Sequence, residues 1–340
     1  MSSALLVRVL RDPAVATALA GDDWTALFAA ARAERLMGTL AHRLAGLDVS
    51  ERVRAILADA RFDAETERRQ ALWEADRAKV ALADLGVRIV LLKGTAYVAA
   101  GLMAARGRAI GDLDILVARD RLDMVEGALL AAGWEWVKPD PYDDAYYRRW
   151  MHELPPLIHR ERDRMIDVHH AILPLTARPR PDAAAMIADA VELGDGLFTL
   201  SSEDMVCHAA AHMLADGGLE GGLRNLWDIH CLCSEFGEAR GDFYLSLADR
   251  AAHHGLTRAV ARALRLAHDL YGTTVPTDCR IRISDRIFIA RLLSRDGWGR
   301  EGHWLLGQLF YVRSHLLRMP PLMLARHLWT KWRKGYRPVG

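Results

Sequence analysis

The segment from Asp112 to Val117 most constrains what this chain can fold into. It reads Asp-Leu-Asp-Ile-Leu-Val, so its first four residues alternate between charged and apolar side chains. In a β-strand, residues i and i+2 lie on the same side, so Asp112 and Asp114 are expected side by side, opposite Leu113 and Ile115. Adjacent carboxylates repel each other, which raises the pKa of one of them unless a cation lies between them. We therefore interpret this strand as part of a divalent-metal site.

A phosphate-binding turn is predicted before this strand. The β-branched apolar run 87–92 is expected to be a strand, and it ends at Lys93, Gly94 and Thr95. A turn of this kind at the start of a helix offers backbone N–H groups and the positive end of the helix dipole to phosphate. A helix is expected over 95–105.

Two arginines and a third acid complete the set of candidate site residues. Arg106 and Arg108 lie just before the acidic pair, where a guanidinium could form forked hydrogen bonds with phosphate oxygens. A hairpin is predicted around the charged turn 161–163, and its second arm carries Asp167 and His169 on one face. Buried carboxylates are costly unless they are paired or bind a metal, so the three acids favour Mg²⁺-dependent phosphoryl or nucleotidyl transfer. The alternative is that Asp112 caps a turn and Asp114 pairs with an arginine.

The remaining chain is expected to be mostly helical. Residues 4–85 read as helices, and Ser50 is the expected N-cap of a long helix that ends at Gly86. From residue 181 the pattern is helical again, and Ser201 with Asp204 forms a capping-box pattern. We expect an α+β fold with three parts: an N-terminal helical region (1–85), a nucleotide-transfer core (86–175) and a C-terminal helical domain (176–340).

Composition adds few constraints on function. The 45 Lys and Arg residues nearly balance 44 Asp and Glu residues, so net charge gives no argument for nucleic-acid binding. The four cysteines show no framework spacing and the N-terminus has no cleavage site, so we expect reduced thiols in a cytoplasmic protein. No window approaches about 18 uncharged apolar residues, so no spanning helix is expected.

These motifs, in this order, resemble the uncharacterised nucleotidyltransferases of the DNA polymerase β-like superfamily. That superfamily has a Gly-Ser or Gly-Gly turn that opens a helix, then Asp-x-Asp, then a third carboxylate on a later strand. Gly94-Thr95 matches the turn with Thr in place of Ser, Asp112 and Asp114 match the pair, and Asp167 fits the third position. The resemblance spans about 87–175, with weaker similarity in the helical part.

The resemblance extends to Arg108, which matches an arginine that this subgroup often carries four residues before the first Asp. One departure is the spacing from Gly94 to Asp112, which is longer than in minimal members. The loop 104–111 is therefore expected to be mobile until nucleotide binds.

The resemblance implies a polymerase β-like core that transfers a nucleotidyl group from an NTP, with ATP as the expected donor, to an unidentified small-molecule, peptide or protein acceptor. Asp112 and Asp114 would hold two Mg²⁺ ions, and Asp167 would hold the ion that activates the acceptor and would serve as its base.

The donor phosphates have their own implied contacts. Gly94 and Thr95 would hold the β- and γ-phosphates, and Lys93 or Arg108 would neutralise charge on the leaving pyrophosphate. Two rival functions remain open at this point: phosphoryl transfer from the same site, and a non-catalytic nucleotide-binding or partner-binding module of the antitoxin-like kind.

Some histidines and a further acid have two interpretations. His169 either touches the acidic site or is a packed or surface histidine. His208 and His212 have the i, i+4 spacing of a shared metal site, but we favour ordinary core packing because no Cys-x-x-Cys accompanies them. Asp228 either faces the cleft or pairs with Arg224 four residues earlier.

The C-terminal segment mixes aromatic and basic side chains in a pattern resembling a helix at a membrane surface. We favour an amphipathic helix packed on the domain with a basic last turn. The residues concerned are Arg326, Trp329, Lys331, Trp332, Arg333, Lys334 and Arg337.

Overall fold

A mixed seven-stranded sheet lies at the centre of the fold, with strand order β3-β4-β5-β2-β1-β7-β6. The protein is described from a computed structural model, which covers residues 2–137, 141–215, 219, 221–276, 279–318, 329 and 333. The strands are β1 (Ile89–Leu91), β2 (Leu113–Leu116), β3 (Trp134–Trp136), β4 (Leu157–His159), β5 (Met165–His169), β6 (Val191–Gly194) and β7 (Leu197–Thr199).

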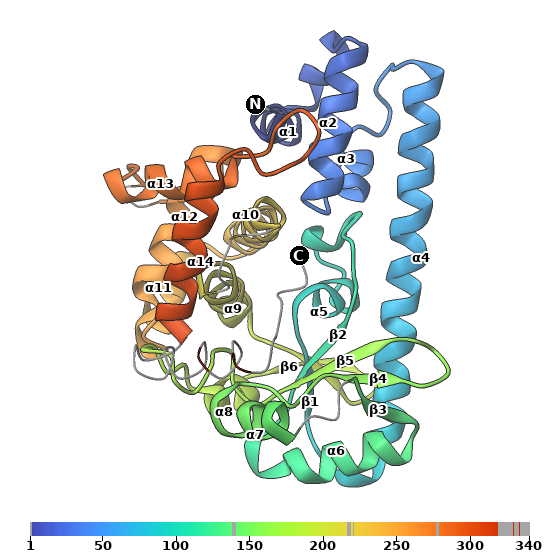
Figure 1. The fold of residues 1–340 in the computed structure, drawn as a ribbon, viewed down its shortest axis with the longest axis vertical. Helices are drawn as coiled ribbons and strands as arrows, with labels where there is room; N and C mark the ends of the chain where they lie inside the picture. The colour runs from blue at the N-terminus through green and yellow to red at the C-terminus, as the bar shows by residue number, and fades with distance from the viewer. Residues whose placement is uncertain are drawn as a thin grey trace.

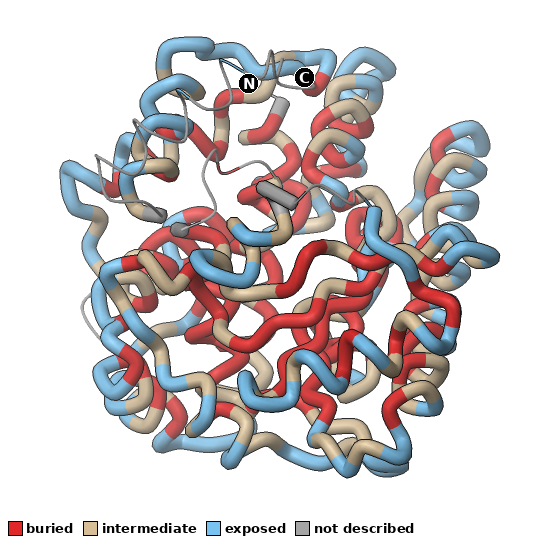
Figure 2. Tube along the Cα trace, turned by 60° about the horizontal axis from the view of Figure 1, so that its bottom comes forward, coloured by how far each residue is buried: buried red, intermediate tan, exposed pale blue. Residues whose placement is uncertain are grey.

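Burial follows position in the sheet. Every residue of β1 and β2 is buried, whereas the edge strand β6 has mainly exposed residues. The strands in the middle of the molecule are accordingly drawn mostly as buried, and the outer faces of the helices as exposed (Figure 2). Continuous apolar runs form such interior strands because both of their faces are covered.

Strand register places two of the predicted acids together. β2 pairs in parallel with β5, and Asp114 is the register partner of Asp167. β1 pairs antiparallel with β2. The predicted hairpin is confirmed, because β4 and β5 form an antiparallel pair around residues 160–164. Because Asp114 and Asp167 are directly opposite on neighbouring strands, they form the base of the candidate site.

Helices from the N-terminal part flank the sheet. The long helix α4 runs along one side of the molecule, from α3 at one end to α6 near the sheet (Figure 1). As predicted, Ser50 caps its start, with Oγ accepting from Val53 N at 3.5 Å. The α-helix ends at Leu82, and a 3₁₀ turn (Ala83–Leu85) continues it to Gly86, which has a left-handed conformation. These helices are α1 (Ser2–Arg11), α2 (Gly21–Ala33), α3 (Met37–Arg43) and α4 (Glu51–Leu82).

The remaining helices lie between the strands or follow them. α9 packs against α10, α11 and α12, and these form a bundle beside the sheet (Figure 1). The bounds are α5 (Lys93–Ala99), α6 (Leu122–Ala131), α7 (Pro141–Trp150), α8 (Ala183–Ala188), α9 (Ser202–Ala215), α10 (Gly222–Ala239), α11 (Phe243–His253), α12 (Thr257–Tyr271), α13 (Ile283–Leu292) and α14 (Trp304–Arg318).

The expectation of helices alone after residue 181 is wrong. β6 and β7 form an antiparallel hairpin, and β7 extends the sheet by pairing in parallel with β1. The sequence does contain a signal for this hairpin: Asp195-Gly196 is a typical two-residue turn between two short runs, and both residues have positive φ. The predicted helix 95–105 is also shorter: α5 ends at Ala99, and a 3₁₀ turn covers Met103–Ala105. The division into parts at 85 and 175 stays a prediction, although the sheet continues to Thr199.

The cysteines, the helix lengths and the C-terminal segment were each the subject of an expectation from the sequence. All four cysteines are free, as their spacing suggested. No helix among the described residues is long and apolar enough to cross a bilayer. The basic aromatic C-terminal segment lies outside the described residues, apart from Trp329 and Arg333.

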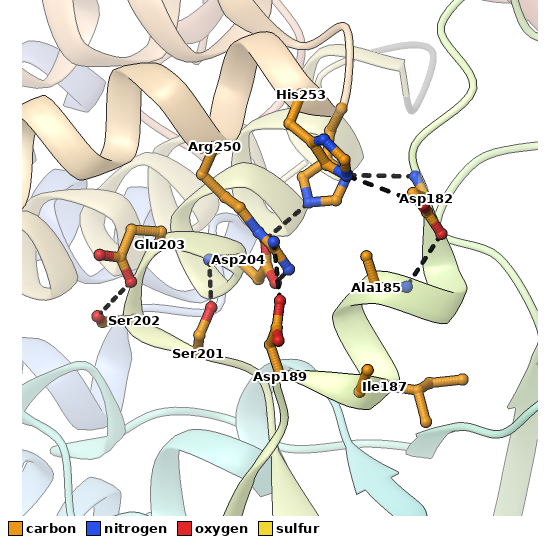
Figure 3. Close-up of polar contacts among 12 residues, drawn as sticks. Asp182, Ala185, Ile187, Asp189, Ser201, Ser202, Glu203, Asp204, Arg250 and His253 are labelled. Atoms are coloured by element: carbon orange, nitrogen blue, oxygen red, sulfur yellow. Dashed lines mark hydrogen bonds and ion pairs between the residues drawn. The ribbon is translucent and has the colours of Figure 1, made fainter.

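The buried carboxylate of Asp204 links helices of the bundle to one another and, through Arg250, to the segment before β6. Asp204 accepts two hydrogen bonds from Arg250, at 2.7 and 2.6 Å, and lies 2.9 Å from His254 Nε2. His254 Nδ1 accepts from Asp182 N, and Arg250 also pairs with Asp189 (Figure 3). Ser201 Oγ accepts from Asp204 N, so only this half of the expected capping box forms. The Asp204 carboxylate instead connects α9 with α11.

Asp204→Asn is expected to lower the free energy of unfolding by about 2 kcal/mol at pH 7, because charge-assisted hydrogen bonds are lost from a buried site. Burial alone would raise the pKa of Asp204, but its hydrogen bonds from Arg250 and His254 outweigh burial and lower it. The stabilisation is therefore present above the pKa of an unfolded aspartate and disappears in acid. Urea unfolding at pH 7 and pH 3 measures both effects.

Asp189→Asn is the matched control, because Asp189 contacts the same arginine but is half exposed. It should cost less than about 1 kcal/mol. Equal losses in the two variants would contradict the structural role given to Asp204.

Candidate functional site

Asp114 is the centre of the candidate site. Its Oδ1 accepts from Lys93 Nζ at 2.6 Å and lies 3.0 Å from His169 Nε2. Burial alone would raise the pKa of Asp114, but Lys93 and His169 hold it well below the usual range. Asp114 is therefore a charged carboxylate in the interior of the sheet. It pairs with a lysine and a histidine, and not with an arginine as the alternative interpretation required.

Lys93 reaches Asp114 from the first residue of α5. Its backbone is left-handed, with φ of +49°, which is uncommon for a residue with a side chain. Burial alone would lower the pKa of Lys93, but the Asp114 carboxylate outweighs burial and raises it. Lys93 thus places a permanent positive charge between the phosphate turn and the acids.

Asp167 is the acid whose surroundings most need a cation. Its Oδ1 is buried and has no hydrogen-bond partner among the described residues. Burial, together with the nearby Asp114 and Glu153 carboxylates, raises the pKa of Asp167 to about 7. An unpartnered carboxylate oxygen beside two other acids is costly in the absence of a counter-charge.

Asp112 is less central than predicted. It is exposed and lies one residue before β2, so it is not itself a strand residue. Partial removal from water and the Asp114 carboxylate raise its pKa, while Lys93, Arg35 and Arg164 oppose this shift. The Asp112 carboxylate therefore lies at the edge of the site, where the charges of the other site residues still affect its pKa.

The cluster suits a divalent cation. Ligand atoms of Asp114, Asp167 and His169 all lie within 4.8 Å of one another, and those of His152, Glu153 and His169 form a second group of this kind among the described residues. Carboxylate oxygens suit Mg²⁺ and Mn²⁺, and imidazole nitrogen suits several transition metals. The unpartnered Asp167 oxygen is the observation that best fits a ligand of such a cation.

The predicted phosphate turn lies against Arg108. Gly94 and Thr95 are buried in the first turn of α5, and the Thr95 hydroxyl has no hydrogen-bond partner among the described residues. A Cβ added to Gly94 would overlap Arg108 Nη1, so the guanidinium packs directly on this glycine. Arg108 also lies over the Tyr97 ring, at 5.4 Å from its centroid. Glycine is therefore required here for close packing.

Gly94→Ala is expected to lower the free energy of unfolding by about 1 to 3 kcal/mol, as overpacking of a buried contact usually does. The Arg108 side chain cannot move aside freely, because it is buried and paired. Gly127→Ala, on the exposed face of α6, is the control: a Cβ there meets nothing within 4 Å, and alanine favours the helix. Thermal unfolding of both variants measures the difference, and equal effects would show that Arg108 yields easily.

Arg108 connects the sheet region to the helical bundle. Its Nε donates to Asp228 Oδ2 at 3.0 Å, and Arg224 Nη1 lies 3.6 Å from the same oxygen. Asp228 thus forms the expected pair with Arg224, and Arg108 binds it more closely. Burial and the charge of Arg108 lower the pKa of Arg224 to about 10, consistent with two cations around one carboxylate.

The segment before β4 contributes groups that the sequence did not single out. His170 N donates to His152 O, and Glu153 forms an isolated antiparallel bridge with His169. Glu153 Oε2 consequently lies 3.4 Å from His169 Nδ1. His152 and Glu153 fall in a stretch without hydrophobic periodicity, so no pattern could assign them to this place.

The comparisons with known proteins bear on this arrangement. The profile of a family described as "Uncharacterised nucleotidyltransferase" matches residues 20–272, well over half of the chain. The chain belongs to this family. A search of curated proteins gives no match.

The match to the nucleotidyltransferase family extends well beyond the acids. It begins just before α2 and ends next to the last residue of α12, so it includes the sheet, the acidic cluster and the Arg108–Asp228 pair. The family profile therefore covers helices before and after the sheet, from α2 to α12, as well as the sheet itself. The resemblance seen in the sequence is confirmed at the level of the family.

Proposed function

We propose that the protein transfers a nucleotidyl group from an NTP, with ATP as the donor, to a hydroxyl-bearing acceptor in a Mg²⁺-dependent reaction. The family match supports the reaction class, and one observation supports the site. Asp114 and Asp167 are register partners on neighbouring strands, and one buried Asp167 oxygen has no partner among the described residues. Among reactions that need such a cluster, phosphoryl and nucleotidyl transfer fit best.

Asp112, Asp114 and Asp167 would hold the metal, with two ions in the full reaction. Bound Mg²⁺ would supply charge neutralisation for the phosphate oxygens. Lys93 would leave Asp114, or share it, as the donor phosphates arrive. The exposed Asp112 would then close the site from its edge.

Lys93, Gly94, Thr95 and Arg108 would bind the donor phosphates. Lys93 and Arg108 bring positive charge next to the turn, and charge stabilisation is needed where pyrophosphate leaves. Asp228 positions Arg108 by accepting a hydrogen bond from its Nε, and Nη1 of the same guanidinium packs against Gly94. This arrangement supports a polymerase β-like core that cooperates with the helical regions 1–85 and 176–340.

Asp167 would take the proton from the acceptor hydroxyl. The acceptor oxygen then forms a bond to the α-phosphorus as the bond to the β-phosphate oxygen breaks, and pyrophosphate leaves. A pKa near 7 suits a general base that works near neutral pH.

A specific observation favours a second candidate, the non-catalytic nucleotide-binding module. Lys93 Nζ lies 2.6 Å from Asp114 Oδ1 and therefore occupies the carboxylate oxygen that would otherwise bind a metal ion. A protein that kept Lys93 in this place would bind nucleotide without turnover.

The test uses ATP labelled at the α- or the γ-phosphate, Mg²⁺ and a cell extract as a source of acceptors. Nucleotidyl transfer moves the α-label to an acceptor and releases the γ-label in pyrophosphate, whereas phosphoryl transfer moves the γ-label. If neither label moves although ATP binds, the non-catalytic candidate is correct.

A further inference from the structure

A small cavity lies beside Asp167, and of the residues proposed to bind the donor phosphates only Lys93 lines it. Its volume is about 230 Å³, and its polar lining includes His152, Glu153, His208 and His212 as well as Asp167. Asp112, Gly94 and Arg108 do not line it. A lining that includes Asp167 but neither Gly94 nor Arg108 is what an acceptor site would require.

The lining selects for hydrogen-bond donors with positive charge. Asp167 Oδ1 and the Glu153 carboxylate are acceptors. The charge of Lys93, which also lines the cavity, is balanced by Asp114 and, in the proposed donor complex, by the donor phosphates. Burial lowers the pKa of His208 to about 3, and that of His212 also lies well below its ordinary value, so neither adds positive charge at neutral pH. A negatively charged ligand would meet the carboxylates of Asp167 and Glu153, whereas the charge of the lysine in the described lining is already balanced.

The volume of the cavity and its apolar side chains limit the size and the chemistry of the ligand. Ligand pockets for drug-sized molecules usually measure about 300 to 1,000 Å³, so this cavity suits a compact group. Ile172 and Leu173 supply an apolar wall next to the carboxylates. Such a wall contacts a short carbon skeleton while the polar groups fix its orientation.

Building on the proposed function, we infer that this cavity is the acceptor site and that the acceptor is a compact amino alcohol. Its hydroxyl points to Asp167 and its ammonium group to Glu153, with the carbon skeleton on Leu173. In the transfer step the hydroxyl oxygen bonds to the α-phosphorus, its proton passes to Asp167, and pyrophosphate leaves with the electron pair of the broken bond. Glu153 is a specificity-determining residue, since it contacts the ammonium and not the reacting oxygen.

The test uses two probes that differ only at one carbon: 2-amino-1,3-propanediol, which carries an ammonium group, and glycerol, which carries a hydroxyl there. Both are titrated into the full chain saturated with Mg²⁺ and α,β-methylene-ATP, which cannot react. The imidazole ¹H–¹⁵N NMR signals of His152 and His208 report binding in the cavity. The amine probe should bind about tenfold more tightly than glycerol, as a charge-assisted hydrogen bond provides.

Glu153→Gln keeps the shape of the side chain and should abolish this preference. Leu173→Trp should fill the cavity and remove binding of both probes while the dissociation constant for α,β-methylene-ATP stays within about twofold. Circular dichroism confirms that each variant is folded. Labelled transfer from α-³²P-ATP to the amine probe, lost in Leu173→Trp, completes the expected result.

Several outcomes overturn the inference. Equal binding of the two probes, a preference that persists in Glu153→Gln, or tighter binding of inorganic phosphate to the same signals would each refute the amino-alcohol assignment while leaving the proposed function intact. If α,β-methylene-ATP does not bind but the amine preference holds, the proposed function fails and the acceptor role fails with it.

Discussion

Asp167→Asn is expected to lower the rate of nucleotidyl transfer by about 10²- to 10⁴-fold, because it removes both a metal ligand and the proposed base. The amide has the same shape but neither the charge nor the proton affinity of the carboxylate. Transfer of label from α-³²P-ATP measures the rate.

The same substitution should make the metal-free protein more stable at alkaline pH. Folded Asp167 has a pKa near 7, above its value of about 3.8 in the unfolded chain, so the folded state keeps a proton that the unfolded state has lost. Wild-type stability therefore falls as pH rises from about 4 to 7. In EDTA at pH 8, Asp167→Asn should be more stable by on the order of 3 kcal/mol, and at pH 4 the two proteins should be equal.

Asp163→Asn is the matched control for both effects. It makes the same chemical change in the same hairpin, but Asp163 is exposed in the turn, with a left-handed backbone that asparagine tolerates. It should change neither the transfer rate nor the pH dependence. An Asp167→Asn protein that is no more stable than wild type at pH 8 would contradict the raised pKa.

Asp228→Ala is expected to lower the free energy of unfolding by about 3 to 5 kcal/mol. The carboxylate is buried and lies 3.0 Å from Arg108 Nε and 3.6 Å from Arg224 Nη1. Its removal leaves two guanidinium groups in the interior without their shared counter-charge. Urea unfolding measures the loss, and weaker ATP binding should accompany it because Arg108 loses its position beside Gly94.

The control for this prediction is Asp249→Ala, which removes an exposed carboxylate from α11 and should cost less than about 1 kcal/mol. A double variant that replaces Arg108 by Met and Asp228 by Leu should recover part of the stability, since one buried guanidinium group, that of Arg224, and not two, then lacks its counter-charge. A cost below 1 kcal/mol for Asp228→Ala would show that water reaches the pair.

Local patterns predicted the part of the site that lies on regular strands. The two-residue period of a strand placed Asp114 and Ile115 on opposite faces, and the hairpin pattern placed Asp167 and His169 together. The chain could not show that β2 and β5 are parallel neighbours with Asp114 opposite Asp167, since register depends on tertiary packing. The start of β2 at Leu113, which leaves Asp112 at the edge, is likewise a matter of pairing.

Other features required contacts between distant segments. Ser201 and Asp204 have the spacing of a capping box, but Arg250 and His254 lie 46 and 50 residues further along the chain and bind the Asp204 carboxylate. Arg108 was assigned to phosphate from its position before the acids, and its pairing with Asp228 involves a partner 120 residues away. Local spacing cannot reveal such ion pairs, and they decide where both charges lie.

The most direct test of the central claim is a Mn²⁺ titration followed by thermal unfolding, at pH 8, of the wild type and of Asp167→Asn. A cation that binds between Asp114 and Asp167 neutralises the carboxylates that destabilise the metal-free protein. The account predicts that Mn²⁺ raises the unfolding temperature of the wild type, further so with ATP, and leaves that of Asp167→Asn nearly unchanged. Equal stabilisation of the two proteins would contradict a metal site at these acids.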